Sequence, residues 1–369
     1  MINVMKRIFQ FKRMYLLLAL PAGLALVLAA KMDSRWVETL YAQRFHLFLE
    51  RTIGRAISAL PFSVSEILIA LAVLGALFYI GFTIRGSVHN RAWKHVWYRF
   101  SVNVLCVAAV GYFLFVITMG LNYYRASVTE YLGFETDTYS TQQLEQVCTY
   151  LAEQINQTRA ALLEDENGVA QLKDTDFSDL SAAARDCFNE MAADHPGIGT
   201  LTARNKPMLS SRWMSRMLTM GVYFPITMES NINVDMTSYT IPATMCHELA
   251  HVKGFMREDE ANFLGFLATT YATRQDIRYS GYMMAFGYAL QQLAQADRTA
   301  AVRVAQMVSD GVLRDDRADE AYWQPFRNTT IADASGKVYD AYLQSNDQKD
   351  GVKSYGRMVD LLLAWYFQK

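Results

Sequence analysis

The chain has 369 residues, a formal net charge of −1 and a mean hydropathy of +0.04, and 52% of its residues are hydrophobic. This hydropathy is high for a soluble enzyme, and the excess lies in the first third of the sequence, which argues against a chain that is soluble throughout. The balanced charge and the lack of a basic patch after that first third argue against a nucleic-acid partner.

Three nearly uncharged apolar runs occupy the first third, at about residues 14–30, 67–83 and 102–121. Each is close to the roughly 20 residues that an α-helix needs to cross a bilayer. Runs that are apolar on all sides and have basic flanks are hard to place in a water-soluble fold, so we predict three transmembrane helices. Pro21 and the small residues Ala29 and Ala30 leave open that the first run is a cleaved signal sequence.

Basic residues without acidic ones among them flank two of these runs: Lys6, Arg7, Lys12 and Arg13 before the first, and Arg85, Arg91, Lys94 and Arg99 between the second and third. Positively charged flanks stay in the cytoplasm, so three crossings place the chain after about Ala126 outside it. Cleavage of the first run would not change this. We therefore expect a multi-pass protein of the bacterial cell membrane, with a membrane anchor at 1–126 and an extracytoplasmic catalytic domain at 127–369.

The loop after the first run contains apolar residues among charged ones between Trp36 and Ile53. This pattern is typical of an amphipathic helix that lies at the membrane interface. The same helix could instead pack on the downstream domain. Both interpretations give the segment a structural role.

From Thr141 onward the pattern is predominantly helical, beginning with one apolar face that is made of Leu144, Val147, Cys148, Leu151 and Ile155. The exception is the β-rich run at 221–234, which Pro225 interrupts. A proline within such a run indicates an edge strand, and an ordinary hairpin is the alternative. The predicted fold is therefore α+β and mainly α, with a small sheet.

His247, Glu248 and His251 form a His-Glu-x-x-His motif. On a helix the two histidines lie four residues apart on one face, where both can bind the same zinc ion. Glu248 beside them can take a proton from a metal-bound water, which is the general-base role in hydrolases with this motif. Thr240 and Pro242 indicate a helix start just before the motif.

A catalytic zinc site has three protein ligands, and Glu258 is the predicted third one. Gly254 offers a stop for the motif helix, and a second helix is expected to begin near Arg257. On that helix Glu258 and Asn262 share a face, whereas Glu260 points about 200° away from Glu258, so Glu260 is the second choice. The alternative is that these acids only favour the first turn of a helix.

The stretch Glu258-Asp-Glu-Ala-Asn262 resembles the second-helix signature of glutamate-type zincins. That resemblance implies a metal-ligand role for Glu258, a packing role for Ala261, and a role for Asn262 in orienting a ligating histidine. It also implies that part of 223–233 is the sheet edge that binds the substrate backbone. Many members have Asp where this chain has Asn262, and the short interval from His251 to Glu258 requires a tight turn at Gly254.

More closely, the chain resembles the bacterial membrane family known as domain of unknown function 3810 over nearly its whole length. The motifs that carry this resemblance are Asn122-Tyr-Tyr-Arg125, Cys246-His-Glu-Leu-Ala-His251, Arg257-Glu-Asp-Glu-Ala-Asn-Phe263, Arg278-Tyr-Ser-Gly-Tyr282 and Ser354-Tyr-Gly356. The resemblance implies a membrane-anchored, zincin-like metallopeptidase domain after three transmembrane helices, without naming a substrate.

Other polar residues carry less information. Tyr279 and Tyr282 are candidates for stabilising an oxyanion, and packing aromatics are the alternative. Cys246 points about 100° away from the histidines and is expected in the core. Cys148 and Cys187 could pair outside the cytoplasm, which the sequence leaves open.

These features lead to the hypothesis of a membrane-anchored metallopeptidase that uses Zn²⁺ and cleaves a peptide or protein substrate outside the cytoplasm. His247, His251 and Glu258 are its metal ligands, Glu248 is its catalytic base, and the lipid bilayer is its other partner. One alternative is a catalytically inactive zincin-like protein that binds or senses. A second is a non-enzymatic membrane scaffold in which the motif is accidental.

The predicted orientation can be tested with a reporter fused after Lys369. The basic flanks are expected in the cytoplasm, and three crossings then place the catalytic domain outside it. A reporter that works only outside the cytoplasm should therefore be active. A reporter that is active only in the cytoplasm would reverse the assignment.

Overall fold

The computed structural model describes residues 12–89, 93–346 and 355–368, and it is mainly helical with small sheets. The predictions on Lys6, Arg7, Arg91 and Ser354 lie outside these residues. The chain divides into two compact units, the first made of Met1–His46 and Val64–Arg125 and the second of Leu47–Ser63 and Ala126–Lys369.

Three helices of the first unit are long and apolar enough to span a membrane: Lys12–Met32, Val64–Val88 and Trp93–Thr118. They comprise η1 (Lys12–Leu18) with α2 (Ala19–Met32), then α5 (Val64–His89) and α6 (Trp93–Thr118). The basic residues between the second and third runs were expected in a loop, but both helices extend beyond the apolar runs, so Arg85 lies within α5, and Lys94 and Arg99 lie within α6. Its first turns are rich in aromatic and basic residues, which suit a membrane interface. It ends at Thr118 and is followed by η4 (Gly120–Tyr124), so the predicted end at residue 121 was too late.

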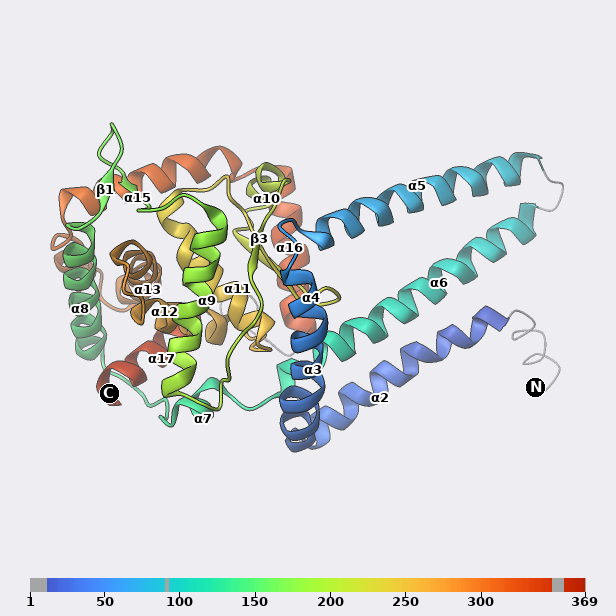
Figure 1. The fold of residues 1–369 in the computed structure, drawn as a ribbon, viewed down its shortest axis with the longest axis horizontal. Helices are drawn as coiled ribbons and strands as arrows, with labels where there is room; N and C mark the ends of the chain where they lie inside the picture. The colour runs from blue at the N-terminus through green and yellow to red at the C-terminus, as the bar shows by residue number, and fades with distance from the viewer. Residues whose placement is uncertain (1–11, 90–92, 347–354, 369) are drawn as a thin grey trace. The chain divides into compact units, whose positions relative to one another are not determined.

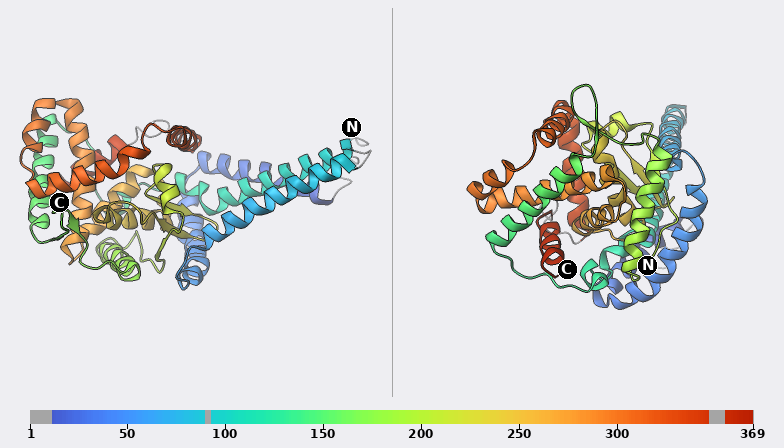
Figure 2. Two further views of the ribbon diagram at one scale, coloured as in Figure 1. Left: turned by 90° about the horizontal axis from the view of Figure 1, so that it is seen from above. Right: turned by 60° about the vertical axis from the view of Figure 1, so that its left-hand side comes forward.

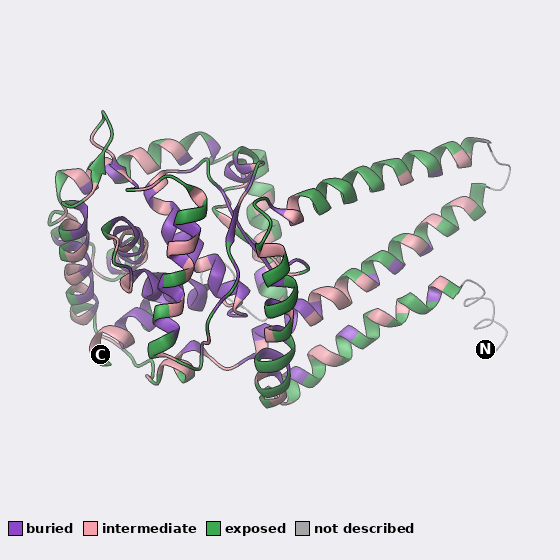
Figure 3. Ribbon diagram, viewed as in Figure 1, coloured by how far each residue is buried: buried purple, intermediate pink, exposed green. Residues whose placement is uncertain are grey.

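The helices α2, α5 and α6 run side by side (Figures 1 and 2). Their apolar side chains face outward, and Figure 3 shows α5 exposed along almost its whole length. Phe78 and Leu74, for example, are 77% and 62% exposed. Apolar exposure on this scale is typical of a surface that lipid covers. These helices support association of the chain with a membrane.

The motif Asn122-Tyr-Tyr-Arg125 follows α6 and belongs to the first unit. Asn122 is buried, and its Nδ2 lies 3.1 Å from Nδ1 of His46 and 3.4 Å from the Tyr41 hydroxyl. Arg125 pairs with Glu38 at 3.7 Å. Both His46 and Glu38 lie on η2 (Val37–His46). The motif therefore holds η2 against the end of α6, which is a structural role.

The segment after η2 continues as α3 (Leu47–Leu49), η3 (Glu50–Gly54) and α4 (Arg55–Ser58), and it belongs to the second unit. Oε1 of Glu50 accepts hydrogen bonds from both the backbone N–H and the hydroxyl of Thr202, each at 3.1 Å. Lys206 donates to the carbonyls of Ser58 and Leu60. Of the two interpretations of the amphipathic loop, packing on the downstream domain holds for residues 47–63.

The second unit contains most of the remaining elements. Its helices up to the motif are α7 (Val128–Leu132), α8 (Thr141–Arg159), α9 (Phe177–Asp194), α10 (Ser211–Arg216), η5 (Ser238–Thr240) and α11 (Ile241–Val252). Those after it are α12 (Glu258–Thr270), α13 (Gln275–Ala296), α14 (Arg298–Ala305), α15 (Asp310–Trp323), η6 (Gln324–Phe326), α16 (Thr330–Ser345) and α17 (Tyr355–Gln368). The predicted apolar face of α8 is buried at every one of its five positions.

Two small sheets accompany these helices. β1 (Leu163–Glu164) and β2 (Ala170–Gln171) form an antiparallel pair. The other sheet has the order β3-β5-β4, in which β3 (Asn205–Pro207) is parallel and β4 (Gly221–Phe224) antiparallel to the central β5 (Glu229–Ile232). The β-rich run is thus a hairpin whose first strand, β4, lies at the sheet edge. Pro225 lies just after β4 in the turn, where a missing N–H removes no ladder hydrogen bond.

The motif helix α11 lies at the centre of the second unit, behind α9 in the view of Figure 1. It contacts α9, α12 and α13 as well as the strands β4 and β5. Eleven of its twelve residues are buried, so other parts of the unit enclose the helix on nearly every side. A helix buried on all sides cannot move without disturbing several neighbours, which gives the motif a fixed position.

A buried ion pair joins α8 to α15. Nε of Arg159 donates to Asp315 at 2.5 Å, and Asp315 also accepts from the Ala170 N–H at 2.8 Å and the Tyr279 hydroxyl at 2.6 Å. The Asp315 side chain is fully buried and that of Arg159 is 5% exposed. Burial and the neighbouring Asp315 raise the pKa of Tyr279, which keeps its hydroxyl a donor. Asp315 is thus the acceptor that these three donors share, and Arg159 pairs in addition with the half-exposed Glu164 at 2.9 Å.

We expect Asp315→Ala to lower the free energy of unfolding by about 3–5 kcal/mol, because it removes the buried acceptor that Arg159 and the Tyr279 hydroxyl share and leaves Arg159 only the half-exposed Glu164 as an acidic partner. Thermal and chemical unfolding of the full chain in detergent would measure the loss. The matched control is Asp316→Ala at the exposed neighbouring position, which should change stability by less than about 0.5 kcal/mol. Equal effects of the two substitutions would contradict this account of the cluster.

Candidate metal centre

The structure brings His247, His251 and Glu258 together. One side-chain donor atom from each lies within 4.8 Å of the others, and no other group of His, Cys, Asp or Glu in the described part of the chain is close enough to hold a metal ion. The two histidines lie one turn apart on α11, with ring centroids 4.7 Å apart. Glu258 is the first residue of α12 and faces both of them.

The donor distances fit a metal ion better than hydrogen bonds. Nε2 of His247 is 3.5 Å from Oε2 of Glu258, and Nε2 of His251 is 3.6 Å from Oε1. Both exceed the normal range for an N–H···O hydrogen bond. Two donors bound to one zinc ion at about 2.1 Å and a tetrahedral angle lie about 3.4 Å apart. The three side chains therefore suit one zinc ion and leave its fourth position for another ligand.

The turn between the two helices fixes how His251 is presented. Gly254 has a φ of +93°, which a residue with a Cβ rarely adopts. The N–H of Gly254 donates to the His251 carbonyl and that of Phe255 to the Ala250 carbonyl, at 2.9 and 3.0 Å. This is the Schellman arrangement that ends a helix at a glycine. It is the tight turn that the short interval between His251 and Glu258 requires.

The same turn also orients the His251 ring. The Phe255 carbonyl lies 2.8 Å from Nδ1 of His251, and a carbonyl can only accept, so Nδ1 carries the proton. Nε2 then keeps its lone pair and faces Glu258. Backbone carbonyls are frequent partners of metal-binding histidines, since they fix the ring and raise its basicity.

For His247 the relevant features are its burial and its neighbour Asn262. Burial, with a smaller contribution from His251, holds the pKa of His247 well below its usual range, so the ring is neutral and able to bind metal. Asn262 lies beside it and opposes part of this shift, while Nδ1 of His247 has no hydrogen-bond partner among the described residues. The resemblance implied that Asn262 orients a ligating histidine, and the structure places it next to His247.

Glu248 is buried next to the three donors. Burial, reinforced by the nearby Glu258, raises the pKa of Glu248 well above its usual value. Its Oε2 has no hydrogen-bond partner among the described residues. Gly221, at the start of β4, lies against it so closely that a Cβ there would be 2.5 Å from Oε1 of Glu248. The carboxyl group therefore lies between the three candidate ligands and the edge strand.

The other acids of the segment have partners elsewhere. Oε1 of Glu260 accepts from the Val128 N–H at 2.9 Å and pairs with Arg257 at 2.7 Å. Asp259 pairs with Arg357 of α17 at 3.0 Å. The structure thus gives Glu260 and Asp259 roles in packing α12 against its neighbours, and directs Glu258 alone toward the histidines.

Sequence reasoning missed Tyr288 of α13. Its hydroxyl donates to Oδ1 of Asn262 at 3.5 Å, so it lies behind the partner of His247. No motif marks this residue, and only the packing of α13 on α12 brings it near. By contrast, Tyr279 and Tyr282 lie elsewhere: Tyr279 binds Asp315, and Tyr282 makes an edge-to-face contact with Phe266, with ring centroids 5.9 Å apart.

The four cysteines are free and buried. Cys148 and Cys187, which the sequence left as a possible pair, are therefore not joined. Cys246 lies in the core as expected, and its Sγ is 3.8 Å from the Ala184 carbonyl of α9. Burial raises the pKa of Cys187 to about 12, so this thiol is not a reactive thiolate at neutral pH.

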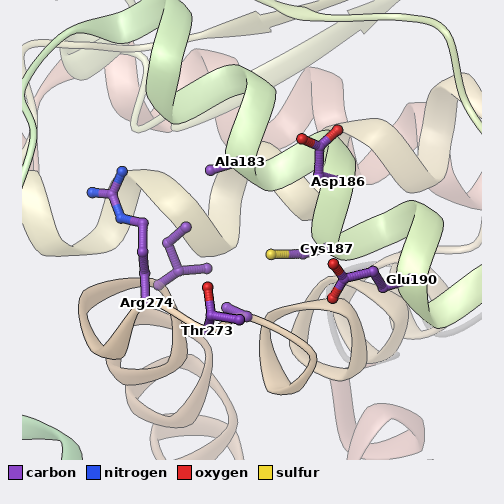
Figure 4. Close-up of a pocket in the computed structure, with 8 residues that line it drawn as sticks. Ala183, Asp186, Cys187, Glu190, Thr273 and Arg274 are labelled. Atoms are coloured by element: carbon purple, nitrogen blue, oxygen red, sulfur yellow. The ribbon is translucent and has the colours of Figure 1, made fainter.

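Two cavities lie apart from the metal-binding side chains. One, of about 220 Å³, lies between α9 and the start of α13, with Asp186, Cys187 and Glu190 on one side and Thr273 and Arg274 on the other (Figure 4). Its cation is already engaged, because Arg274 pairs with Asp276 at 2.6 Å. The other cavity, of about 260 Å³, is lined by α8, α12, α13 and α17.

Comparison with known proteins gives one match. A family model described as "Protein of unknown function (DUF3810)" matches residues 41–363, which is most of the chain. No match to the chain was found among curated proteins or among solved structures. The matched range includes the last two apolar helices and every residue of the candidate centre.

Gly265 allows α12 to approach α11 closely, and we expect Gly265→Ala to damage the centre. A Cβ at this position would lie 3.0 Å from the backbone nitrogen and 3.1 Å from Cα of His247, so α12 and Glu258 would have to move away. Zinc affinity, measured by competition with a chromophoric chelator, should fall about tenfold or more.

The matched control is Gly287→Ala, at a helical glycine where an added Cβ meets no atom within 4 Å. It should leave zinc affinity unchanged and stabilise α13 by at most about 1 kcal/mol. Equal zinc affinities of the two variants would show that the close contact at Gly265 does not position the ligands.

Proposed function

Because the chain belongs to the DUF3810 family of proteins of unknown function, its activity has to be inferred from the site, and we propose that it is a membrane-anchored zinc metallopeptidase. In this proposal its second unit is a zincin-like catalytic domain that hydrolyses peptide bonds of a peptide or protein outside the cytoplasm. His247, His251 and Glu258 bind the zinc ion, and Glu248 is the catalytic base.

One observation carries the proposal: three donors of the types that zinc prefers converge with Glu248 beside them. A structural zinc site would be closed by four protein ligands, often cysteines, whereas here Cys246 is directed at α9. A site with three protein ligands has room for water or substrate at the fourth position. Zinc, when bound, lowers the pKa of a water molecule and polarises a carbonyl group.

The role of Glu248 follows from its surroundings. The residue is 4% exposed, and Oε2 is free of hydrogen bonds to other described residues. A raised pKa suits a group that takes a proton from a water molecule and later gives it to the leaving amine. An isolated carboxyl group in this position has no structural task, which favours a catalytic one.

The edge strand β4 supports a peptide as the substrate. The Met220 carbonyl accepts from the Asn233 N–H, so the alternation of an antiparallel ladder turns the backbone groups of Gly221 away from β5. An extended peptide that pairs with this edge would lie beside Glu248, because Gly221 contacts that side chain. The absence of a side chain at Gly221 keeps the strand and the base close together.

The location belongs to the same proposal. Three apolar helices support a membrane anchor, and the basic residues Lys12, Arg13 and Arg85 near the helix ends favour a cytoplasmic side for those ends. The alternatives are an inactive zincin-like protein, which would bind zinc without cleaving peptides, and a membrane scaffold, which would not bind zinc. The buried Glu248 favours the enzyme over both.

We expect Glu248→Gln to retain zinc and to lower peptide-bond cleavage by about 10²–10⁴-fold, because glutamine keeps the shape of the side chain and cannot accept the proton. Zinc content is measured by metal analysis of the purified full chain. Cleavage is measured by comparing membrane-associated peptides between cells that contain the wild type and cells that contain the variant.

The control with the same chemical change is Glu153→Gln on the exposed face of α8, which should cleave like the wild type. If the wild type cleaves and Glu248→Gln cleaves equally well, Glu248 is rejected as the base. If neither cleaves but both hold zinc, the zinc-binding pseudoenzyme is favoured. His247→Ala separates these from the scaffold. If the purified wild type holds no stoichiometric zinc and His247→Ala changes nothing, the metal site itself is refuted.

A further inference from the structure

The cavity formed by α8, α12, α13 and α17 has the composition of a binding site. It has a volume of about 260 Å³, and its lining includes one cation, one amide and four aromatic rings: Arg278, Gln154, Tyr150, Tyr271, Tyr282 and Trp365. None of the described residues that line it is acidic. Two of these residues, Arg278 and Tyr282, are the ends of the motif Arg278-Tyr-Ser-Gly-Tyr282, which the metal centre does not use.

Arg278 lacks an acidic partner. No carboxylate forms an ion pair with it among the residues that the structure describes, and its Nε is buried without a hydrogen-bond partner there. Its hydrogen bond to the Tyr282 hydroxyl is long, at 3.4 Å, and its guanidinium lies 6.0 Å from the centre of the Tyr282 ring. Arg274, one turn earlier on the chain, differs because it pairs with Asp276 at 2.6 Å. Arg278 therefore remains able to pair with an acidic ligand.

The hydroxyl groups around Arg278 are donors. Burial raises the pKa of Tyr150, and the adjacent Tyr282 raises it further, so the Tyr150 hydroxyl stays protonated at neutral pH. Burial, together with Asp194 outside the cavity, raises the pKa of Tyr271 to about 12. The Tyr271 hydroxyl donates its single proton to Asp194, so the donors left for a ligand are Arg278 and the hydrogen-bonded pair of Tyr150 and Tyr282. A guanidinium beside a protonated hydroxyl favours an anionic ligand.

Size and shape narrow the ligand further. A volume of about 260 Å³ is below the range of about 300–1,000 Å³ that drug-sized ligands occupy. The four rings favour a flat or aromatic group, which would stack on them. The planar guanidinium matches the two oxygens of a carboxylate.

The cavity is separate from the metal centre. Leu267 and Thr270, which line it, follow Glu258 on α12 by nine and twelve residues. At about 1.5 Å per residue, they lie about 14–18 Å along the helix from that ligand. A molecule of this size in the cavity therefore does not reach the metal-binding side chains.

We propose that this cavity binds a small organic carboxylate that carries a flat ring, with the carboxylate on Arg278 and the ring among Tyr150, Tyr282 and Trp365. The site is distinct from the peptidase centre and does not depend on the proposed zinc chemistry. A free aromatic acid and the C-terminus of a short peptide both carry such a group.

The test is calorimetric titration of the full chain in detergent, in the presence of a zinc chelator, with phenylacetate as the probe. Phenylacetate should bind with a dissociation constant of about 1 mM or tighter. Phenylacetamide has the same shape without the charge, and acetate has the charge without the ring, so both should bind at least about tenfold more weakly. N-acetylphenylalanine, tested in parallel, distinguishes the two sources: tighter binding than phenylacetate indicates a peptide terminus, and weaker binding a free acid.

Arg278→Gln should lower phenylacetate affinity at least about tenfold, and Arg278→Lys, which keeps the charge but not the planar fork, should retain part of it. Arg298→Gln on exposed α14 is the matched control and should bind like the wild type. Equal affinity of the wild type for phenylacetate and phenylacetamide, or no binding of either, would overturn the proposal even if Arg278→Gln failed to fold. So would unchanged affinity in a folded Arg278→Gln variant.

Discussion

The close contact between α11 and α12 is the constraint on which the candidate centre depends. Two features make it possible: Gly254 turns the chain at a positive φ, and Gly265 leaves no side chain between its helix and the backbone of His247. The turn at Gly254 reverses the chain within the few residues between His251 and Glu258, and the contact at Gly265 keeps the two helices close together. Because the Phe255 carbonyl of the same turn accepts from His251, one short segment fixes both the position and the tautomer of this histidine.

The cost of burying these side chains argues that they have a common task. Burial favours the neutral form of each ionisable group, and it depresses the pKa of His247 while it raises that of Glu248. Where the fold buries other acids it supplies partners, as Arg159 and the Tyr279 hydroxyl do for Asp315 and Arg257 does for Glu260. At the centre no described cation pairs with Glu248, whose closest charged neighbour is the acid Glu258. A metal ion would compensate the cluster in a way that further packing cannot.

Local pattern was enough to predict the elements around the site, and long-range packing decided the rest. The spacing of the two histidines and the glycine after them predicted α11, the turn and the start of α12, because caps and periodicity act within a few residues. Helical phase also separated Glu258 from Glu260, and the structure places only Glu258 beside the histidines. Tyr288, the Asp315 cluster and the start of α6 at Trp93 could not be read from the sequence, because each depends on segments that are distant along the chain or on the membrane interface.

The motifs of this chain divide by the environment that the fold gives them. Asn122 and Arg125 fasten η2 beside α6, and Tyr279 completes a buried ion pair, so these residues have partners that account for them. Glu248 and Arg278 differ from them, since neither side chain forms an ion pair among the described residues, and Oε2 of the first and Nε of the second are buried without a hydrogen-bond partner there. A buried polar atom without a hydrogen-bond partner costs about 1–3 kcal/mol of stability, so such atoms are rare and often belong to functional sites. The two residues lie on α11 and α13, which both pack on α12, so the same helix would connect the proposed metal centre and the proposed carboxylate site.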